Sequence, residues 1–181
     1  MRDVVASLAV TLDMFVSRPD GDVQYLDKYV DTGYDFEAFA ATIGGLVMGS
    51  ASYEQAVGWG WTWGDRPTVV MTSRSDLPVP DGADITFSSG STAEEIRALA
   101  ERIDGRVWVF GGGRVVTDGL LGGAVDTLDI AVMPEAIGEG IPLFAEPYDG
   151  TLELLTAIPY DLGMVRLVYR TSDRQVERPD I

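Results

Sequence analysis

The feature that most constrains the fold is a strand-like segment that runs directly into three glycines. Residues 106–110 are rich in β-branched and aromatic side chains, and residues 115–121, beyond Gly111, Gly112 and Gly113, have the apolar pattern of a helix. Glycines at a strand end let the backbone approach an anion closely, while the next helix directs its N-terminus at the same point. The spacing matches neither G-x-G-x-x-G nor a P-loop, so the turn is either an anion cradle or simply a tight strand-to-helix connection.

The rest of the chain alternates between strand-like and helix-like segments. Apolar residues recur at helical spacing in residues 35–43, and again after Ser91, which begins a capping box with Glu94. The final two strands read as a hairpin around residues 159–163. Strands are predicted at residues 4–12, 46–48, 68–72, 85–87, 106–110, 128–133, 152–158 and 164–169. This order predicts an α/β fold of three layers, with a mixed central sheet, helices on both faces and a C-terminal β-hairpin.

The length of 181 residues and the 46% of hydrophobic residues predict one domain with a packed core. We assign residues 1–171 to this domain and residues 172–181, which are polar and contain a proline, to a C-terminal tail.

The chain contains no cysteine and no histidine. Disulfides, thiolate metal sites, cysteine nucleophiles and serine-histidine triads are therefore excluded, and no metal site is expected. Carboxylates, hydroxyls, tyrosines or a bound cofactor must carry any chemistry. A chain this poor in reactive side chains favours a cofactor.

The net charge is strongly negative, because 29 acidic residues face only 13 lysines and arginines, a formal charge of −16. Such a field repels phosphate backbones and anionic lipid surfaces. The apolar runs are also much shorter than the roughly 20 residues of a membrane span. We therefore expect a small-molecule substrate as partner, neither nucleic acid nor a membrane, and a cytoplasmic location because the N-terminal sequence shows no secretory signal.

Two further features are candidate parts of a substrate site. In the helix predicted at residues 35–43, Asp35 shares a face with Phe39 and Ile43, so it is either a catalytic acid beside the core or a first-turn aspartate that complements the helix dipole. The second feature is a glycine-containing loop with three tryptophans at residues 59, 61 and 63. Their indoles suit stacking on a heteroaromatic ring, although a loop that caps the core or a subunit contact is an equal alternative. Both alternatives predict burial of these indoles, which belong to Trp59, Trp61 and Trp63.

Four segments together resemble the dihydrofolate reductase-like family. Residues 107–116, Val-Trp-Val-Phe-Gly-Gly-Gly-Arg-Val-Val, are similar to the nucleotide-binding segment of dihydrofolate reductases and of the reductase domain of bacterial riboflavin biosynthesis. Residues 7–10 with Asp13 resemble the family's first strand, and residues 47–54 resemble its glycine, basic pair, Thr-Tyr/Trp-Glu segment. Residues 133–144 favour the riboflavin-reductase branch.

The resemblance implies that NADPH lies across the sheet edge. Its pyrophosphate would meet the turn from Phe110 through Gly111, Gly112, Gly113 and Arg114 to Val115, and Ser7 and Phe15 would flank the nicotinamide. The adenine-side phosphates would meet Gly49 with the residue after it and then Thr72, Ser73 and Arg74. At the first of these places Ser50 and Ala51 stand where the family has cations, so NADH remains possible as well as NADPH.

These observations predict an enzyme that transfers a hydride from NAD(P)H to a small heteroaromatic substrate of the pteridine, pyrimidine or flavin-precursor type. Two alternatives stay open: a non-catalytic dinucleotide-binding protein on the same fold, and a flavin-binding variant. The resemblance also implies a homodimer, and dihydrofolate reductases have a functional carboxylate at about the place of Asp35.

Overall fold

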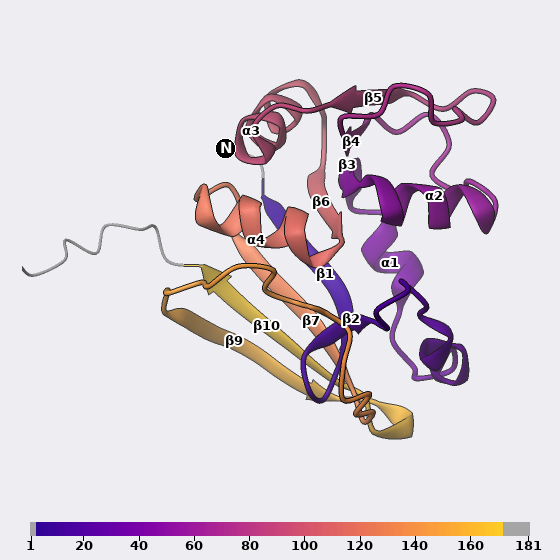
Figure 1. Ribbon diagram of the computed structural model, residues 1–181. Coiled ribbons are helices and arrows are strands. Elements are labelled where there is room, and N and C mark those ends of the chain that lie inside the picture. The colour runs from indigo at the N-terminus through magenta and orange to yellow at the C-terminus, as the bar shows by residue number, and fades with distance from the viewer. Residues whose placement is uncertain (1–2, 172–181) are drawn as a thin grey trace, which may run out of the picture.

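An eight-stranded sheet forms the centre of the protein in a computed structural model that describes residues 3–171 (Figure 1). Its strands are β1 (Val4–Thr11), β3 (Ile43–Gly49), β4 (Thr68–Met71), β5 (Ile85–Ser88), β6 (Arg106–Gly111), β7 (Thr127–Met133), β9 (Leu152–Pro159) and β10 (Val165–Thr171). They lie in the order β5-β4-β3-β6-β1-β7-β10-β9, and the first six in this order are parallel. β10 is antiparallel to both β7 and β9, which confirms the predicted C-terminal hairpin.

Helices cover both faces of this sheet, with α1 (Phe36–Ala40) and α2 (Ser50–Gly58) on one face and α3 (Thr92–Arg102) and α4 (Gly113–Leu121) on the other (Figure 1). Successive strand residues point to opposite faces. Val107 and Val109 therefore pack with α3 and α4, whereas Trp108 between them packs with α1 and α2. The predicted α/β class, a mixed sheet between two helical layers, is confirmed.

The helix predicted at residues 35–43 is wrong in its extent, because α1 ends at Ala40 and Ile43 is the first residue of β3. Phe39 and Ile43 are both buried in the same cluster, so the apolar spacing reports burial correctly but crosses an element boundary. At the start of this strand the chain passes very close to a neighbouring turn, because a Cβ on Gly44 would lie 1.7 Å from the carbonyl oxygen of Asp104.

Short elements beside the sheet were not predicted. They are the 3-10 helices η1 (Gln24–Tyr29) and η2 (Asp161–Gly163), and a two-stranded sheet of β2 (Phe15–Ser17) and β8 (Ile141–Pro142). The small sheet joins the loop after β1 to the segment after β7, and the Leu143 amide donates to the Met14 carbonyl at 2.9 Å. The predicted tail, residues 172–181, lies outside the described residues. Within the described range no helix has the length and apolar character needed to cross a membrane.

Candidate functional site

A cavity of about 1330 Å³ lies at the carboxyl ends of β3, β4 and β6, and residues of α1 and α2 as well as the start of α4 line it. In sheets of parallel strands this edge is where ligands bind. We call one end of the cavity the glycine end, with Gly49, Ser50, Ser52, Gly111, Gly112, Gly113, Arg114 and Val115. We call the other end the floor chamber, with Ser7, Thr32, Tyr34, Asp129, Met133, Met164 and Arg166.

The three glycines at the end of β6 are glycines for three different reasons. Gly111 has a φ of +129°, a conformation that side chains disfavour, and its peptide bond to Gly112 is cis. A Cβ on Gly113 would lie 2.1 Å from the Pro142 carbonyl oxygen, so packing inside the protein excludes a side chain there. A Cβ on Gly112 would meet nothing closer than the Ser52 hydroxyl at 3.8 Å. The protein itself leaves room at Gly112, and that room belongs to the cavity.

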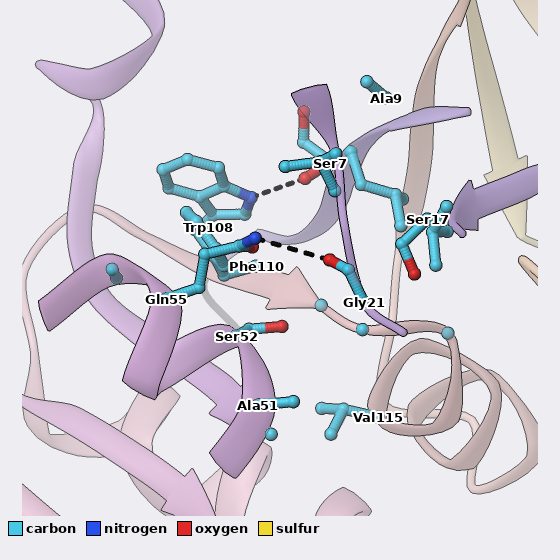
Figure 2. A pocket seen from close by; sticks show the side chains of 18 of the residues that line it. Ser7, Ala9, Ser17, Gly21, Ala51, Ser52, Gln55, Trp108, Phe110 and Val115 are labelled. Carbon is cyan, nitrogen blue, oxygen red and sulfur yellow. Dashed lines mark hydrogen bonds between the residues drawn. The ribbon is translucent and has the colours of Figure 1, made fainter. Parts of the chain in front are cut away.

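Two helix N-termini meet at this point. Gly112 is the N-cap residue of α4, and Gly49 is the N-cap residue of α2, which follows the neighbouring strand β3. A Cβ on Gly49 would lie 3.9 Å from the amide nitrogen of Gly112. Figure 2 shows Ala51 and Ser52 of α2 on one side of the gap and Val115 of α4 on the other. Because the first N–H groups of a helix have no partner within the helix, both starts attract an anion.

The arginines near the glycine end are all engaged with carboxylates. Arg74 donates to both oxygens of Glu54, at 3.2 and 2.5 Å, and this hydrogen bonding lowers the pKa of Glu54. Arg114 donates to Asp118 at 3.0 Å and lies 2.9 Å from Glu146, and its pKa is raised, chiefly by Asp118. Of the three residues expected near the adenine-side phosphates, Thr72 and Ser73 line the cavity and Arg74 does not. The glycine end therefore presents amides and hydroxyls much more than free positive charge.

The first strand contributes Ser7 to the cavity, as the resemblance implies. Its carbonyl oxygen accepts a hydrogen bond of 2.8 Å from the Trp108 indole (Figure 2). Phe15 lies in β2 and is not among the lining residues, whereas its neighbours Val16 and Ser17 are.

The loop after β1 is fixed by Asp13. Its carboxylate accepts hydrogen bonds from the Thr11 hydroxyl at 2.6 Å and the Gly138 amide at 2.8 Å, and these lower the pKa of Asp13, the Thr11 bond most. Further along, the Gln55 side chain of α2 donates to the Gly21 carbonyl at 3.5 Å, a contact that Figure 2 shows reaching across the cavity.

Asp35 occupies the N-cap of α1, where its carboxylate accepts from the Ala38 amide at 2.9 Å. The residue is exposed and does not line the cavity, although Tyr34 and Phe36 on either side of it do. This is the geometry of the alternative in which the aspartate stabilises the start of the helix. The expected position beside the buried stripe is not observed.

The three tryptophans separate from one another. Trp63 packs edge-on against Trp108, with ring centroids 5.2 Å apart, and Trp61 packs against Tyr53. Trp59 is 66% exposed, so the expected burial of all three indoles is wrong. Trp59 and Trp63 line the cavity and Trp61 does not, because its indole turns back to donate to the Gly64 carbonyl. Capping of the core accounts for Trp61 and Trp63.

Sequence reasoning missed the polar pair of the floor chamber. Asp129 on β7 and Arg166 on β10 form two hydrogen bonds of 2.8 and 2.7 Å. An aspartate between Leu128 and Ile130 in an apolar strand was the available signal, since unpaired charges are seldom buried. No cluster of three or more side chains suited to a metal ion occurs between residues 3 and 171.

Known proteins similar to this chain include sequences and solved structures, but no family model matches it. The uncharacterized protein YwjB of Bacillus subtilis (strain 168) is 27% identical over 148 residues, which cover 80% of this chain and 84% of that protein. A putative riboflavin biosynthesis protein from Shewanella sp. PV-4 superposes with a TM-score of 0.77 at 22% identity, covering 96% of this chain and 100% of that one. Dihydrofolate reductase from Enterococcus faecalis, complexed with NADP(H), gives 0.66 at 23% identity, covering 94% and 97%. The chain therefore has the dihydrofolate reductase-like fold that its sequence predicts.

Proposed function

We propose that this protein is a reductase that uses a nicotinamide dinucleotide to reduce a small heteroaromatic substrate of the pteridine, pyrimidine or flavin-precursor type. The observation that carries the proposal is the meeting of the α2 and α4 N-termini across the open space at Gly112. One cavity of about 1330 Å³ continues from that point to Ser7 and the floor chamber, so a dinucleotide and a substrate could lie in it side by side. The solved structures of similar fold include a dihydrofolate reductase with bound NADP(H), and this supports the choice of cofactor.

The residues at the glycine end fit a diphosphate. The amides that follow Gly49 and Gly112 would hold its oxygens, the hydroxyls of Ser50, Thr72 and Ser73 would meet the adenosine side, and Ser7 would lie beside the nicotinamide. The cofactor supplies a hydride when bound. The chain orients the two ligands in one cavity and keeps water from the contact between them, which needs no histidine.

The test of this proposal is Gly112→Asp, which puts a carboxylate into the open space. We expect this variant to lose dinucleotide binding, measured by quenching of tryptophan emission with NADPH and NADH, while its circular dichroism stays native. The matched control is Gly58→Asp, because Gly58 also has no atom near its missing Cβ and does not line the cavity. Equal affinities of Gly112→Asp and the unmodified protein would remove the dinucleotide from this site.

A non-catalytic dinucleotide-binding protein is the second candidate. The ion pairs Arg74–Glu54 and Arg114–Asp118 favour it, because they withdraw the charges that would hold phosphates most tightly. Binding of NADPH without its oxidation, in the presence of pteridine and pyrimidine substrates, would decide for this candidate.

We also propose a homodimer, on the resemblance and on one feature of the surface. Strand β9 is at the edge of the sheet, and Leu154 and Leu155 on it are exposed. An exposed apolar edge strand is a surface that another strand can cover. Light scattering coupled to gel filtration should give twice the mass of the chain, and Leu154→Lys should give the single mass.

A further inference from the structure

The floor chamber contains a pair of opposite charges that the glycine end does not need. Asp129 is only 4% exposed, and its two oxygens accept from Nε and from Nη2 of Arg166 at 2.8 and 2.7 Å. Asp129 on β7 is directly paired with Val168 on the antiparallel strand β10. Arg166 lies two residues before Val168 on the same face of β10, so its side chain reaches Asp129 diagonally. Both residues line the cavity. A buried ion pair costs desolvation energy, so its presence on a cavity wall points to a role other than stability.

The pair leaves the arginine able to donate further hydrogen bonds. A guanidinium has five N–H donors; Asp129 takes two of them and the Tyr160 side chain accepts from a third, which leaves two. The side chain is 24% exposed, and the exposed part belongs to the cavity wall. The guanidinium also lies over the ring of Tyr34, 5.2 Å from its centroid, which fixes its plane. Hydrogen bonding to Asp129 raises the pKa of Arg166 above its ordinary value, so the group stays a cation.

The carboxylate of Asp129 is poorly available to a second donor. Both of its oxygens already accept from Arg166, the residue is only 4% exposed, and a second cation brought to it would also meet the guanidinium. The remaining wall is apolar or aromatic at Met133, Met164 and Tyr34 and has hydroxyls at Ser7 and Thr32. The only charged donor among the residues of the floor chamber is therefore Arg166.

We propose that Arg166, positioned by Asp129, selects the substrate by donating to a ring carbonyl oxygen, so that the floor chamber takes oxo-substituted heterocycles and rejects diamino-substituted ones. A 2,4-dioxo ring offers neutral oxygen acceptors to the free guanidinium N–H groups. A 2,4-diamino ring offers donors and is readily protonated, and it meets a cation whose partner carboxylate is occupied. Arg166 is thus the specificity-determining residue and Asp129 its positioning residue. This inference rests on the proposed function for the reaction that follows binding. The binding preference itself can be measured without that reaction.

The experiment compares two probes that share one bicyclic ring, lumazine (2,4-dioxopteridine) and 2,4-diaminopteridine, titrated against the whole chain. We expect lumazine to bind at least about tenfold more tightly, a difference of about 1.4 kcal/mol. Equal affinity, or tighter binding of the diamino probe, overturns the proposal.

The variant Arg166→Met gives a readout that a purely structural ion pair would not move. It frees the Asp129 carboxylate as an acceptor, so the preference should invert toward 2,4-diaminopteridine, and that probe should raise the melting temperature of the variant. If Arg166→Met does not fold, the double variant Asp129→Leu with Arg166→Met removes both charges together, and lumazine should then lose its advantage. Retention of the wild-type preference in either variant contradicts the proposal.

Titration of NADPH against the same preparations separates this inference from the proposed function. A preference for lumazine without any dinucleotide binding would support the proposed role of Arg166 and contradict the proposed reductase function. Dinucleotide binding with no discrimination between the two pteridines would do the reverse. In the Arg166 variants the NADPH affinity should change less than the lumazine affinity, because the phosphates of the dinucleotide would meet the glycine end, whereas Arg166 lies in the floor chamber.

Discussion

The two ends of the cavity are built on opposite principles. The glycine end offers few free side chains to a ligand. Gly112 leaves open space, and Arg74 and Arg114 are paired with carboxylates. In the floor chamber the chain instead places a buried negative charge, Asp129, against a partly exposed positive charge, Arg166, on the face of the sheet. The first end offers backbone amides, which suit any phosphate, and the second offers one oriented side chain, which suits few ligands. In the function proposed above, affinity for a common cofactor and selection of a particular substrate would thus depend on different kinds of structure.

The largest expected effect breaks the chamber without touching the glycine end. Arg166→Met leaves the carboxylate of Asp129 buried without its partner, and we expect a loss of about 3–5 kcal/mol in the free energy of unfolding. Asp129→Leu with Arg166→Met should recover most of that loss, because no charge is then left unpaired. Urea denaturation followed by circular dichroism measures both, and a double variant as unstable as the single one would contradict the explanation.

The next effect compares substitutions at two neighbouring glycines of the glycine end, one expected to lower stability and one expected to weaken binding. Gly113→Ala brings a Cβ to 2.1 Å from the Pro142 carbonyl oxygen and should cost about 1–3 kcal/mol of stability. Gly112→Ala, one residue earlier, meets no close atom and should change stability by less than about 0.5 kcal/mol while weakening dinucleotide binding. The comparison of Gly112→Ala with Gly113→Ala in denaturation and in NADPH titration separates packing from binding. A loss of stability shared equally by both would contradict it.

A smaller effect is expected from substitutions that provide a free positive charge at the glycine end, as Arg166 does in the floor chamber. Glu54→Gln releases Arg74, which should then tighten NADPH more than NADH, by up to about tenfold. Ser50→Arg should act in the same direction, because Ser50 lines the cavity. The matched control is Glu153→Gln, which releases Arg170 from a similar ion pair on the hairpin. Equal gains for both dinucleotides would place Arg74 away from the adenosine side.

The smallest effect concerns the loop after β1, which joins the small sheet to the cavity. The lowered pKa of Asp13 means that its ionised form stabilises the fold above the ordinary value of 3.8, and that this contribution is lost as the pH falls through the lowered pKa. Asp13→Asn should therefore lower the melting temperature at neutral pH, and the difference from the unmodified protein should shrink below about pH 4. A difference that is constant with pH would assign the effect to packing.

The two ends also differ in how well the sequence predicts them, because the glycine end is formed by local sequence and the ion pair of the floor chamber is not. β6, α4, the Ser91 cap and the final hairpin are confirmed because each depends on residues close together in the chain. The Asp129–Arg166 pair joins residues 37 positions apart, and its existence depends on the register of β7 against β10. A one-residue change of that register would put the two side chains on opposite faces.

Local patterns failed where an element was short or a boundary was unmarked. β2 and β8 have three and two residues, too few for any alternation to show. The helix predicted at residues 35–43 continued the apolar spacing from Phe39 to Ile43 across the end of α1, and the same error placed Asp35 beside the core instead of at the N-cap.

The close approach of Gly113 to Pro142 changes how a run of three glycines is to be interpreted in other chains of this fold. Gly111 and Gly113 are demanded by the architecture, whatever the molecule binds. A protein of this fold that binds no nucleotide would keep the outer two glycines and be free to replace the middle one. If the proposed nucleotide site is correct, the residue at the centre of the triplet indicates whether a related chain can bind the ligand, and its two neighbours indicate only the fold.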